Sequence, residues 1–252
     1  MLPKLRKSMT FPTMCTFCGR YFFLSKMFFM DRGDGSLLNE KLHSYIESLI
    51  PERNPLFTEM EQYAKAHQVP IMELAGMEAM LQILRIQNPK AILEVGSAIG
   101  YSALRMASAA STAKVVTIER DAQRIETAKQ FFKRFGKEDQ VLLIEGDALE
   151  VAEQVGTLGS FDVIFIDAAK GQYKKFFQLY EQFLRSDGVI ITDNVLFKGL
   201  VCEPEIKSKR TRNLVKKIDE FNRWLMQHPH YVTTILPVGD GVAISKKRGD
   251  RK

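Results

Sequence analysis

The sequence predicts an α/β fold built on a mostly parallel sheet with helices on both faces. From Lys90 onward, five apolar runs alternate with helical stretches, an order typical of parallel sheets. The runs are too apolar to leave one sheet face in water, so we expect helices on both sides. Two further runs, joined at Gly239–Gly241, predict an antiparallel C-terminal hairpin at one edge, which gives seven strands.

The elements follow from apolar spacing and from the positions of proline. Leu37–Leu49 has helical spacing and ends at Pro51, and a third helix follows Pro70. The expected helices before the sheet are 37–49, 57–66 and 71–86. The expected strands are 91–95, 114–119, 141–146, 162–167 and 188–193, with helices at 101–110, 121–135, 148–155, 171–184 and 212–227.

Length and composition bound the class of protein. A chain of 252 residues with 45% apolar side chains can bury a sizeable core as one large α/β domain or two small ones. Three cysteines are too few for a disulfide scaffold. The apolar stretches are strand-sized, far short of the ~20 residues that a membrane span needs, so we expect a cytoplasmic protein.

The first thirty residues differ from the rest, with five basic and no acidic side chains. Export is not indicated, because Lys26 interrupts the apolar run and no small-residue cleavage site follows. Cys15 and Cys18 could join a zinc site, but such a site needs four ligands and only Cys202 remains. We expect residues 1–29 to be a disordered extension, or sequence upstream of a start at Met30.

The net charge of +6 is clustered. Residues 31–197 carry 18 basic and 24 acidic side chains, whereas residues 198–217 carry seven against two. The last four residues, 249–252, form a basic tail. A basic cluster suits a nucleic acid or another polyanion, although such a run is more often only a solvated surface.

The first expected strand closes with Glu94-Val95, and glycines follow at positions 96 and 100. In an open α/β sheet ligands bind at the carboxyl ends of the strands, and glycine lets the backbone approach them closely. The G-x-x-x-G spacing differs from the G-x-G-x-x-G of dinucleotide enzymes. A nicotinamide oxidoreductase is therefore disfavoured.

Acidic residues end the next two strands. Glu119 could accept hydrogen bonds from a ribose diol, and Asp147, between Gly146 and Ala148, could contact an adenine amino group. Each could instead cap a helix, and Asp121 has the position of a cap. Three such signals at consecutive strand ends favour a cofactor that contains adenosine.

The fourth and fifth strands end in oxygen-bearing side chains, Asp167 and the pair Asp193-Asn194. Two carboxylates and an amide supply hard oxygen ligands and leave about half of a Mg²⁺ coordination shell open for catalysis. Capping of turns is the alternative explanation for both acids. Lys170 follows Asp167 closely, and a cation nearby disfavours the ammonium form of lysine, so Lys170 could accept a proton.

The remaining reactive residues form no recognisable site. His43, His67, His228 and His230 show neither metal-ligand nor triad spacing, and we expect them to be structural. Cys202 has no evident base partner, and Ser97 and Ser102 lack a G-x-S-x-G motif. Nucleophilic catalysis is therefore not indicated.

Five motifs occur in order along the chain: Glu94-x-Gly96-x-x-x-Gly100, Glu119, Gly146-Asp147-Ala148, Asp167-Ala168-Ala169-Lys170 and Asp193-Asn194. Together they resemble the motifs of the Mg²⁺-dependent O-methyltransferases of the catechol and caffeoyl-CoA type. Between about Met30 and Arg248, the runs VPIMELAGMEAM, FIDAAKGQY and VIITDNVLFKGLV resemble most closely the bacterial members of this family that methylate 5-hydroxyuridine in tRNA.

The resemblance implies a Rossmann-like class I methyltransferase fold, S-adenosylmethionine as cofactor, Mg²⁺ and a homodimer. Residues 30–89 would then cover the cofactor and the dimer interface, and residues 90–248 would form the methyltransferase core. Asp167, Asp193 and Asn194 would hold the metal, and Lys170 would be the base, with Asp167 as the second catalytic residue. The implied cofactor contacts are Met72, Glu94, Gly96, Ser102, Glu119, Asp147, Ala148 and Asp167.

The resemblance implies that the wobble uridine of the tRNA anticodon loop is the substrate and 5-methoxyuridine the product. Catechol and 5-hydroxyuridine both present two neighbouring oxygens that one metal can bind. The basic side chains expected to hold the tRNA are Lys198, Lys207, Lys209, Arg210 and Arg212. Two alternatives remain open: a catechol-type enzyme for small molecules, and a noncatalytic RNA-binding module with a degenerate metal site.

Overall fold

The computed structural model of the chain describes residues 35–248. The predictions for residues 1–29 and 249–252 lie outside this range. The chain divides after Leu49: helix α2 (Gly35–Ser48) belongs to one unit, and the body begins at Ile50. Within residues 35–248 no helix is both long and apolar enough to cross a membrane.

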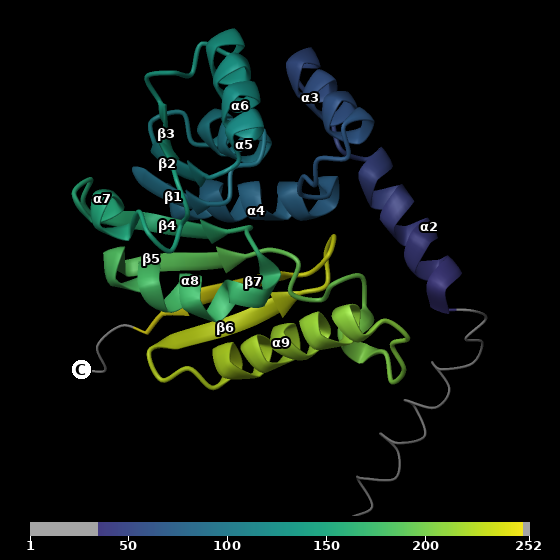
Figure 1. Cartoon of the computed structure of the whole chain (residues 1–252). Helices are drawn as coiled ribbons and strands as arrows, with labels where there is room; N and C mark the ends of the chain where they lie inside the picture. The colour runs from purple at the N-terminus through teal and green to yellow at the C-terminus, as the bar shows by residue number, and fades with distance from the viewer. Residues whose placement is uncertain (1–34, 249–252) are drawn as a thin grey trace, which may run out of the picture. The chain divides into compact units, whose positions relative to one another are not determined.

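The body contains the predicted mostly parallel sheet of seven strands in the described part of the chain (Figure 1). The strand order is β3 (Val141–Glu145), β2 (Lys114–Glu119), β1 (Ala91–Val95), β4 (Phe161–Ile166), β5 (Leu184–Thr192), β7 (Val242–Lys247) and β6 (Tyr231–Leu236). Strands β1 to β5 run parallel, and β7 pairs antiparallel with both β5 and β6.

The C-terminal strand pair forms one edge of the sheet, as predicted, and β6 is its outermost strand. The burial patterns explain this order. Most residues of β7 are buried or half-buried, whereas the first half of β6 alternates between buried and exposed side chains, as expected where one face meets water.

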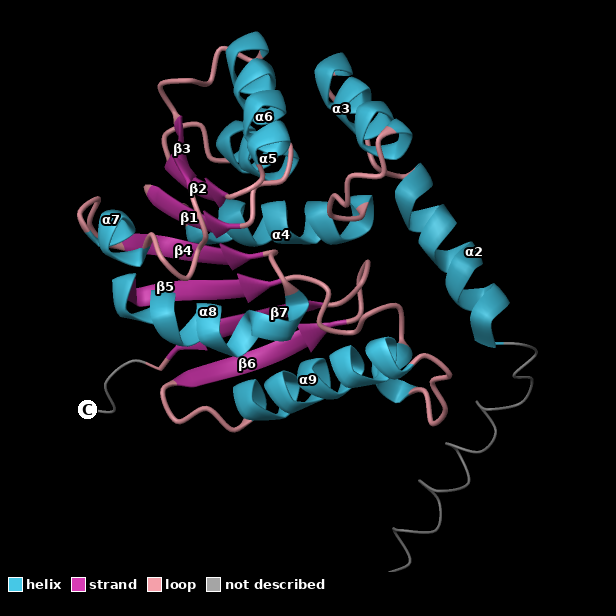
Figure 2. Cartoon of the chain, viewed as in Figure 1, coloured by secondary structure: helices cyan, strands magenta, loops and turns pink. Residues whose placement is uncertain are grey.

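Helices cover both faces of the sheet (Figure 2). Neighbouring residues such as Ile92 and Leu93 point to opposite apolar clusters, because strand side chains alternate. One face packs against α3 (Pro55–Ala66), α4 (Leu74–Gln87), α5 (Tyr101–Ala109) and α6 (Ala122–Arg134), and the other against α7 (Ala152–Gly156), α8 (Tyr173–Tyr180) and α9 (Lys209–Met226).

Two predicted helices differ from the observed ones. The predicted helix 148–155 begins only at Ala152, because Asp147 accepts a hydrogen bond from the Leu149 amide and holds residues 147–151 in a turn. The predicted helix 171–184 is divided into three pieces, η1 (Lys170–Gln172), α8 and η2 (Glu181–Phe183). A third short element, η3 (Leu200–Cys202), precedes α9.

The strand order reverses between β1 and β4. From β1 the chain proceeds to β2 and β3 on one side, and from β4 to β5 on the other. At such a point the loops after the two strands diverge and leave a crevice at the carboxyl edge of the sheet.

Candidate functional site

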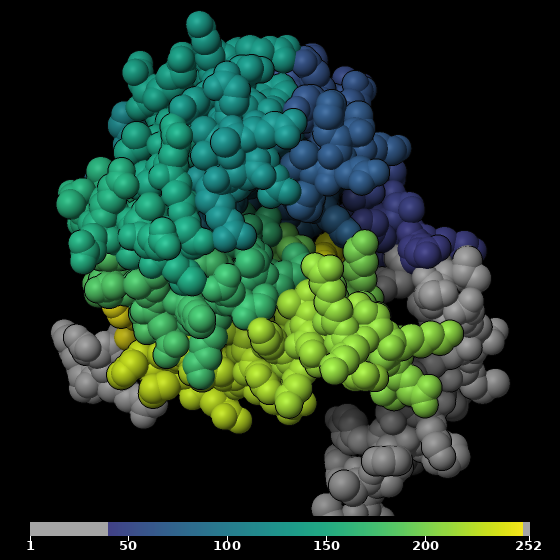
Figure 3. Space-filling view, in the orientation of Figure 1, coloured from purple at the N-terminus to yellow at the C-terminus, as the bar shows by residue number. Residues whose placement is uncertain are grey.

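A pocket of about 590 Å³ lies at this carboxyl edge. In Figure 3 a hollow separates the teal upper part of the molecule from the yellow-green lower part. The predicted site residues that line the pocket are Met72, Gly96, Ser102, Glu119, Asp147, Ala148, Asp167, Lys170, Asp193, Asn194 and Lys198. Glu94 is buried behind the pocket, and Lys207, Lys209, Arg210 and Arg212 do not line it.

The loop after β1 requires its glycine. Gly96 has a φ of +101°, and a Cβ atom there would lie 2.2 Å from the backbone oxygen of Asp167. The first loop of the site therefore packs directly against the end of β4. Gly100, with a φ of +81°, precedes α5, which carries Ser102 into the pocket.

The backbone holds Glu119 in place. Its Oε2 accepts a hydrogen bond from the Ala98 amide at 2.8 Å, and its Oε1 accepts from the amides of Arg120 and Asp121 at 2.9 and 3.0 Å. Glu119 does not cap α6. The cap is Asp121, as predicted, because its side chain accepts hydrogen bonds from two amides of that helix. Glu119 is thus an oriented carboxylate at the wall of the pocket.

Asp147 has two partners. Its Oδ1 accepts from the Leu149 amide at 2.9 Å and its Oδ2 from Arg120 at 2.8 Å. The Leu149 amide and then Arg120 lower the pKa of Asp147, so it is a carboxylate at neutral pH. Asp147 therefore does cap a turn, the alternative role considered from the sequence, and its side chain also lines the pocket.

Asp167 and Asp193 form an acidic pair at the ends of β4 and β5. Burial holds the pKa of Asp193 well above its usual range, and the Asp167 charge raises it further. Burial also raises the pKa of Asp167, with Lys170 acting in the opposite direction. Asp193 Oδ1 is buried without a hydrogen-bond partner in the described part of the chain.

Lys170 and Asn194 complete this corner of the pocket. Lys170 Nζ donates to Asn194 Oδ1, and Asn194 Nδ2 donates to Asp193 Oδ2 at 3.2 Å. Tyr173 fixes the backbone here, because its hydroxyl donates to the Asp193 carbonyl at 2.9 Å. Asn194 has a φ of +58°, which its short polar side chain tolerates.

No group of three His, Cys, Asp or Glu side chains within residues 35–248 is arranged as a metal centre. The predicted ligand set contains only two such side chains, Asp167 and Asp193, and its third member is the amide of Asn194. The available donors are therefore hard oxygens, the type that Mg²⁺ prefers.

Asp240 is a pocket residue that the sequence analysis did not identify. It is 8% exposed, and its Oδ1 accepts a hydrogen bond from the Lys198 amide. The Leu196 amide donates to the Asp240 carbonyl at 3.0 Å. The only signal in the sequence was an acid between Gly239 and Gly241, which is typical of a hairpin turn.

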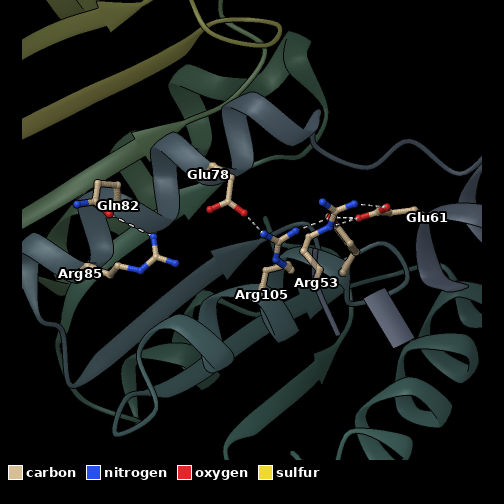
Figure 4. A network of polar contacts seen from close by, with 7 residues as sticks. Arg53, Glu61, Glu78, Gln82, Arg85 and Arg105 are labelled. Atoms are coloured by element: carbon tan, nitrogen blue, oxygen red, sulfur yellow. Dashed lines mark hydrogen bonds and ion pairs between the residues drawn. The ribbon is translucent and has the colours of Figure 1, made fainter. Parts of the chain in front are cut away.

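A second unpredicted feature is a polar network beside the pocket (Figure 4). Arg105 is 4% exposed, pairs with Glu78 and donates to the Tyr101 hydroxyl at 2.7 Å. That hydroxyl donates to Glu61 at 2.6 Å, and Arg53 contacts Glu61 with two nitrogens at 3.2 and 3.0 Å. Because Tyr101 lines the pocket, the network connects α3 and α4 to its wall.

The basic cluster lies at the beginning of α9. Lys207, Lys209 and Arg210 are exposed, Arg212 follows one turn into the helix, and Ser208 caps the helix. None of the four basic residues forms an ion pair with another described side chain. α9 packs against η1, which carries Lys170, so the cluster begins on an element that adjoins the pocket.

The histidines and Cys202 stay outside the pocket. His228 is buried among Phe177, Trp224 and Tyr231, and this burial lowers its pKa. His67 stacks on the Tyr63 ring with centroids 3.9 Å apart. Cys202 is a free, exposed thiol.

The sheet is mostly parallel, and its switch point carries a polar pocket lined by carboxylates at the ends of four strands. These features define an α/β protein of the class that binds nucleotide-like cofactors. The model of one protein family, the O-methyltransferase family, matches residues 47–248. The chain therefore belongs to the O-methyltransferase family.

Individual relatives agree with this assignment. A caffeoyl-CoA O-methyltransferase from Eucalyptus gunnii is 29% identical over 226 residues, 85% of this chain and 91% of that protein. A candidate caffeoyl-CoA O-methyltransferase from Staphylococcus aureus is 40% identical, with a TM-score of 0.76 over 84% of this chain and 100% of that one. The S-adenosylhomocysteine-bound methyltransferase PaMTH1 from Podospora anserina is 28% identical, with a TM-score of 0.75 over 85% of this chain and 97% of that one.

Proposed function

We propose that this protein is an S-adenosylmethionine- and Mg²⁺-dependent O-methyltransferase that converts 5-hydroxyuridine at the wobble position of tRNA to 5-methoxyuridine. The observation that supports the substrate is the basic cluster at the beginning of α9, a helix that packs against η1, the element that carries the pocket residue Lys170. A small neutral substrate would not need four such cations outside the pocket.

The pocket suits the cofactor. Glu119 presents an oriented carboxylate for a ribose diol, and Asp147 and Ala148 lie at the next strand end for the adenine ring. Ser102 and Met72 line the remaining wall. The relative PaMTH1 is described with S-adenosylhomocysteine bound, which supports the same cofactor class here. When bound, S-adenosylmethionine supplies a transferable methyl group.

The residues present also fit Mg²⁺. Asp193 Oδ1 is buried without a partner in the described part of the chain, which is costly unless a ligand takes it up. The raised pKa values of Asp167 and Asp193 reflect desolvation of two acids that lie close together, Asp193 buried and Asp167 half-buried, and a cation would relieve their repulsion. Asn194 would supply the third oxygen. When bound, Mg²⁺ would favour ionisation of a hydroxyl coordinated to it.

The protein's own residues would then hold and deprotonate the substrate. Lys170 would take the hydroxyl proton on Nζ, which lies beside the Asn194 oxygen. Lys198 stands at the rim, and the α9 cluster would contact phosphates of the anticodon loop. A wobble base is unstacked, so it can be turned out into such a pocket.

The test is methyl transfer from labelled S-adenosylmethionine to tRNA that carries 5-hydroxyuridine and, in parallel, to a simple catechol, with Mg²⁺ and with chelator. We expect label in the tRNA that is lost in chelator. Label only in the catechol would move the protein to the small-molecule branch. Tight tRNA binding without any transfer would favour the noncatalytic module.

We also propose that two copies associate through α2 and the residue that follows it. Leu42, Tyr45, Ile46 and Leu49 follow helical spacing on one face, and all four side chains are more than two-fifths exposed. Light scattering should give the mass of a dimer for the full chain. Leu42→Asp together with Leu49→Asp should give the mass of a monomer, whereas a dimer in that variant would place the interface elsewhere.

A further inference from the structure

Glu94 is a buried acid that the family resemblance placed among the cofactor contacts. It lies in β1, is 0% exposed and does not line the pocket. With Glu94 as a carboxylate, the Ser102 hydroxyl on α5 donates to its Oε1, and the Thr117 hydroxyl on β2 donates to its Oε2. Within residues 35–248 Glu94 forms no ion pair with a Lys, Arg or His side chain.

The protons of this triad can be counted. Each hydroxyl has one proton to donate, and an ionised carboxylate only accepts. If Glu94 were ionised, the protons of Ser102 and Thr117 would both point at it, and Ser102 would offer the pocket only lone pairs. If Glu94 is neutral, its own O–H can donate to one hydroxyl and release that hydroxyl's proton for another acceptor.

The surroundings decide which hydroxyl is released. Thr117 is fully buried, and Glu94 is the one partner of its hydroxyl in the described structure. A proton released there would be left without an acceptor, which is costly. Ser102 lines the pocket, where a ligand can accept its proton. The arrangement that satisfies every group has the acid proton on Oε1, facing Ser102.

We propose that Glu94 is a positioning residue held as a neutral carboxylic acid, which donates to Ser102 and so directs the Ser102 hydroxyl proton to the carboxylate of the cofactor's amino-acid end. The inference rests on the proposed cofactor, S-adenosylmethionine, whose amino-acid end carries this carboxylate. It does not depend on the identity of the methyl acceptor.

The charges around Glu94 agree with a neutral acid. Burial raises its pKa to about 8, against the lowering effect of the two hydroxyls, and the acids Asp167 and Glu119 at neighbouring strand ends raise it further. Arg105 lies on the same helix as Ser102, but it pairs with Glu78 and donates to the Tyr101 hydroxyl, not to Glu94. No positive charge in the described part of the chain therefore compensates a carboxylate at this position.

The test is the affinity of the full-length protein for S-adenosylmethionine, measured by calorimetry at neutral pH. Glu94→Gln keeps a donor for Ser102 and an acceptor for Thr117, so its Kd should stay within about twofold of wild type. Glu94→Met removes both bonds and should weaken binding roughly tenfold. An equal loss in Glu94→Gln would mean that the negative charge is required, and would overturn the proposal.

A double-mutant cycle separates positioning from a general structural effect. Ser102→Ala alone should weaken binding, and Glu94→Met should weaken it little further in the Ser102→Ala background, because the two residues act through one hydrogen bond. Additive losses would contradict this route. A wild-type protein that binds S-adenosylmethionine but methylates no tRNA would overturn the proposed substrate and leave this inference intact.

Infrared spectroscopy provides a readout that does not depend on binding. At neutral pH the spectrum of wild type minus that of Glu94→Gln should contain the carbonyl band of a protonated carboxylic acid, which should disappear above the pKa of Glu94. Because Asp167 and Asp193 are present in both proteins, their bands cancel in the difference. A carboxylate band at neutral pH would overturn the proposal even if Glu94→Met fails to fold.

Discussion

The backbone amide of Lys198 donates a hydrogen bond to Oδ1 of Asp240, and this bond joins the loop after β5 to the turn between β6 and β7. Phe197 and Lys198 have positive φ angles of 46° and 55°, which cost on the order of 1–3 kcal/mol each and must be held by their surroundings. Both residues line the pocket, so the bond shapes its rim.

Asp240→Ala should therefore raise the KM for the methyl acceptor roughly tenfold, equivalent to about 1.4 kcal/mol. The Kd for S-adenosylmethionine should stay within about twofold, since the loop adjoins the proposed acceptor side. Steady-state kinetics and calorimetry measure the two quantities. Asp240→Asn is the matched control, because it keeps the accepting oxygen, and a KM as high as that of the alanine variant would rule out this role.

The α9 cluster should bind tRNA through phosphates. Reversing the charge at Lys207, Lys209, Arg210 and Arg212 together should weaken tRNA binding and make it less dependent on salt. The slope of log affinity against log salt concentration should become shallower by about 0.7–0.9 for each phosphate that is no longer neutralised. Affinity for S-adenosylmethionine should not change. The control is Lys133→Glu, an exposed cation of α6 that does not line the pocket. Unchanged tRNA affinity in the fourfold variant would remove RNA binding from this segment.

Much of the fold could be predicted because each strand is a short apolar run with a polar end. The limits of β1 and β2 agree residue for residue with the runs 91–95 and 114–119. The helix expected at 148–155 was wrong in its first half, because Asp147 binds the Leu149 amide. Sequence spacing alone does not reveal whether an Asp caps a turn or begins a helix.

The site was predictable where it follows strand ends and was missed where it depends on pairing between distant segments. Asp167 and Asp193 each follow an apolar run, so topology alone brings them together. Asp240 comes from a hairpin turn, and only the antiparallel pairing of β7 with β5 brings it to the pocket. Arg105 lies within a helix, where nothing in the sequence signals burial of its charge.

Arg105 should be important for stability, because its removal leaves the half-buried Glu78 without its ion-pair partner and deprives the Tyr101 hydroxyl, which still donates to Glu61, of its donor. Arg105→Ala should lower the free energy of unfolding by about 3–5 kcal/mol. The matched control is Arg85→Ala, since Arg85 contacts Gln82 at an exposed site and should contribute within about 0.5 kcal/mol. Urea denaturation measures both, and equal losses would contradict a structural role of the network.

Stability should also depend on pH through Glu94. Its pKa is about 8 in the folded protein against an ordinary value of 4.5, so between these values the folded state retains a proton that the unfolded chain has released. The free energy of unfolding should therefore fall as pH rises through this window, by up to about 5 kcal/mol.

Glu94→Gln carries no such proton and should lose less stability between pH ~5 and pH ~8 than wild type. Urea denaturation at the two pH values gives the comparison. The same pH dependence in both proteins would show that another group is responsible.

Asp193 should be essential for the metal. Asp193→Ala removes the buried oxygen that lacks a partner and one of the two acids at this corner of the pocket, so Mg²⁺-dependent turnover should be abolished. Mg²⁺ should raise the Tm of wild type, because a ligand that binds only the folded state stabilises it, and should leave the Tm of Asp193→Ala unchanged. Asp187→Ala, at an exposed position of β5, is the matched control and should respond like wild type. Full activity in chelator, or an equal shift of Tm in Asp193→Ala, would show that no metal is held there.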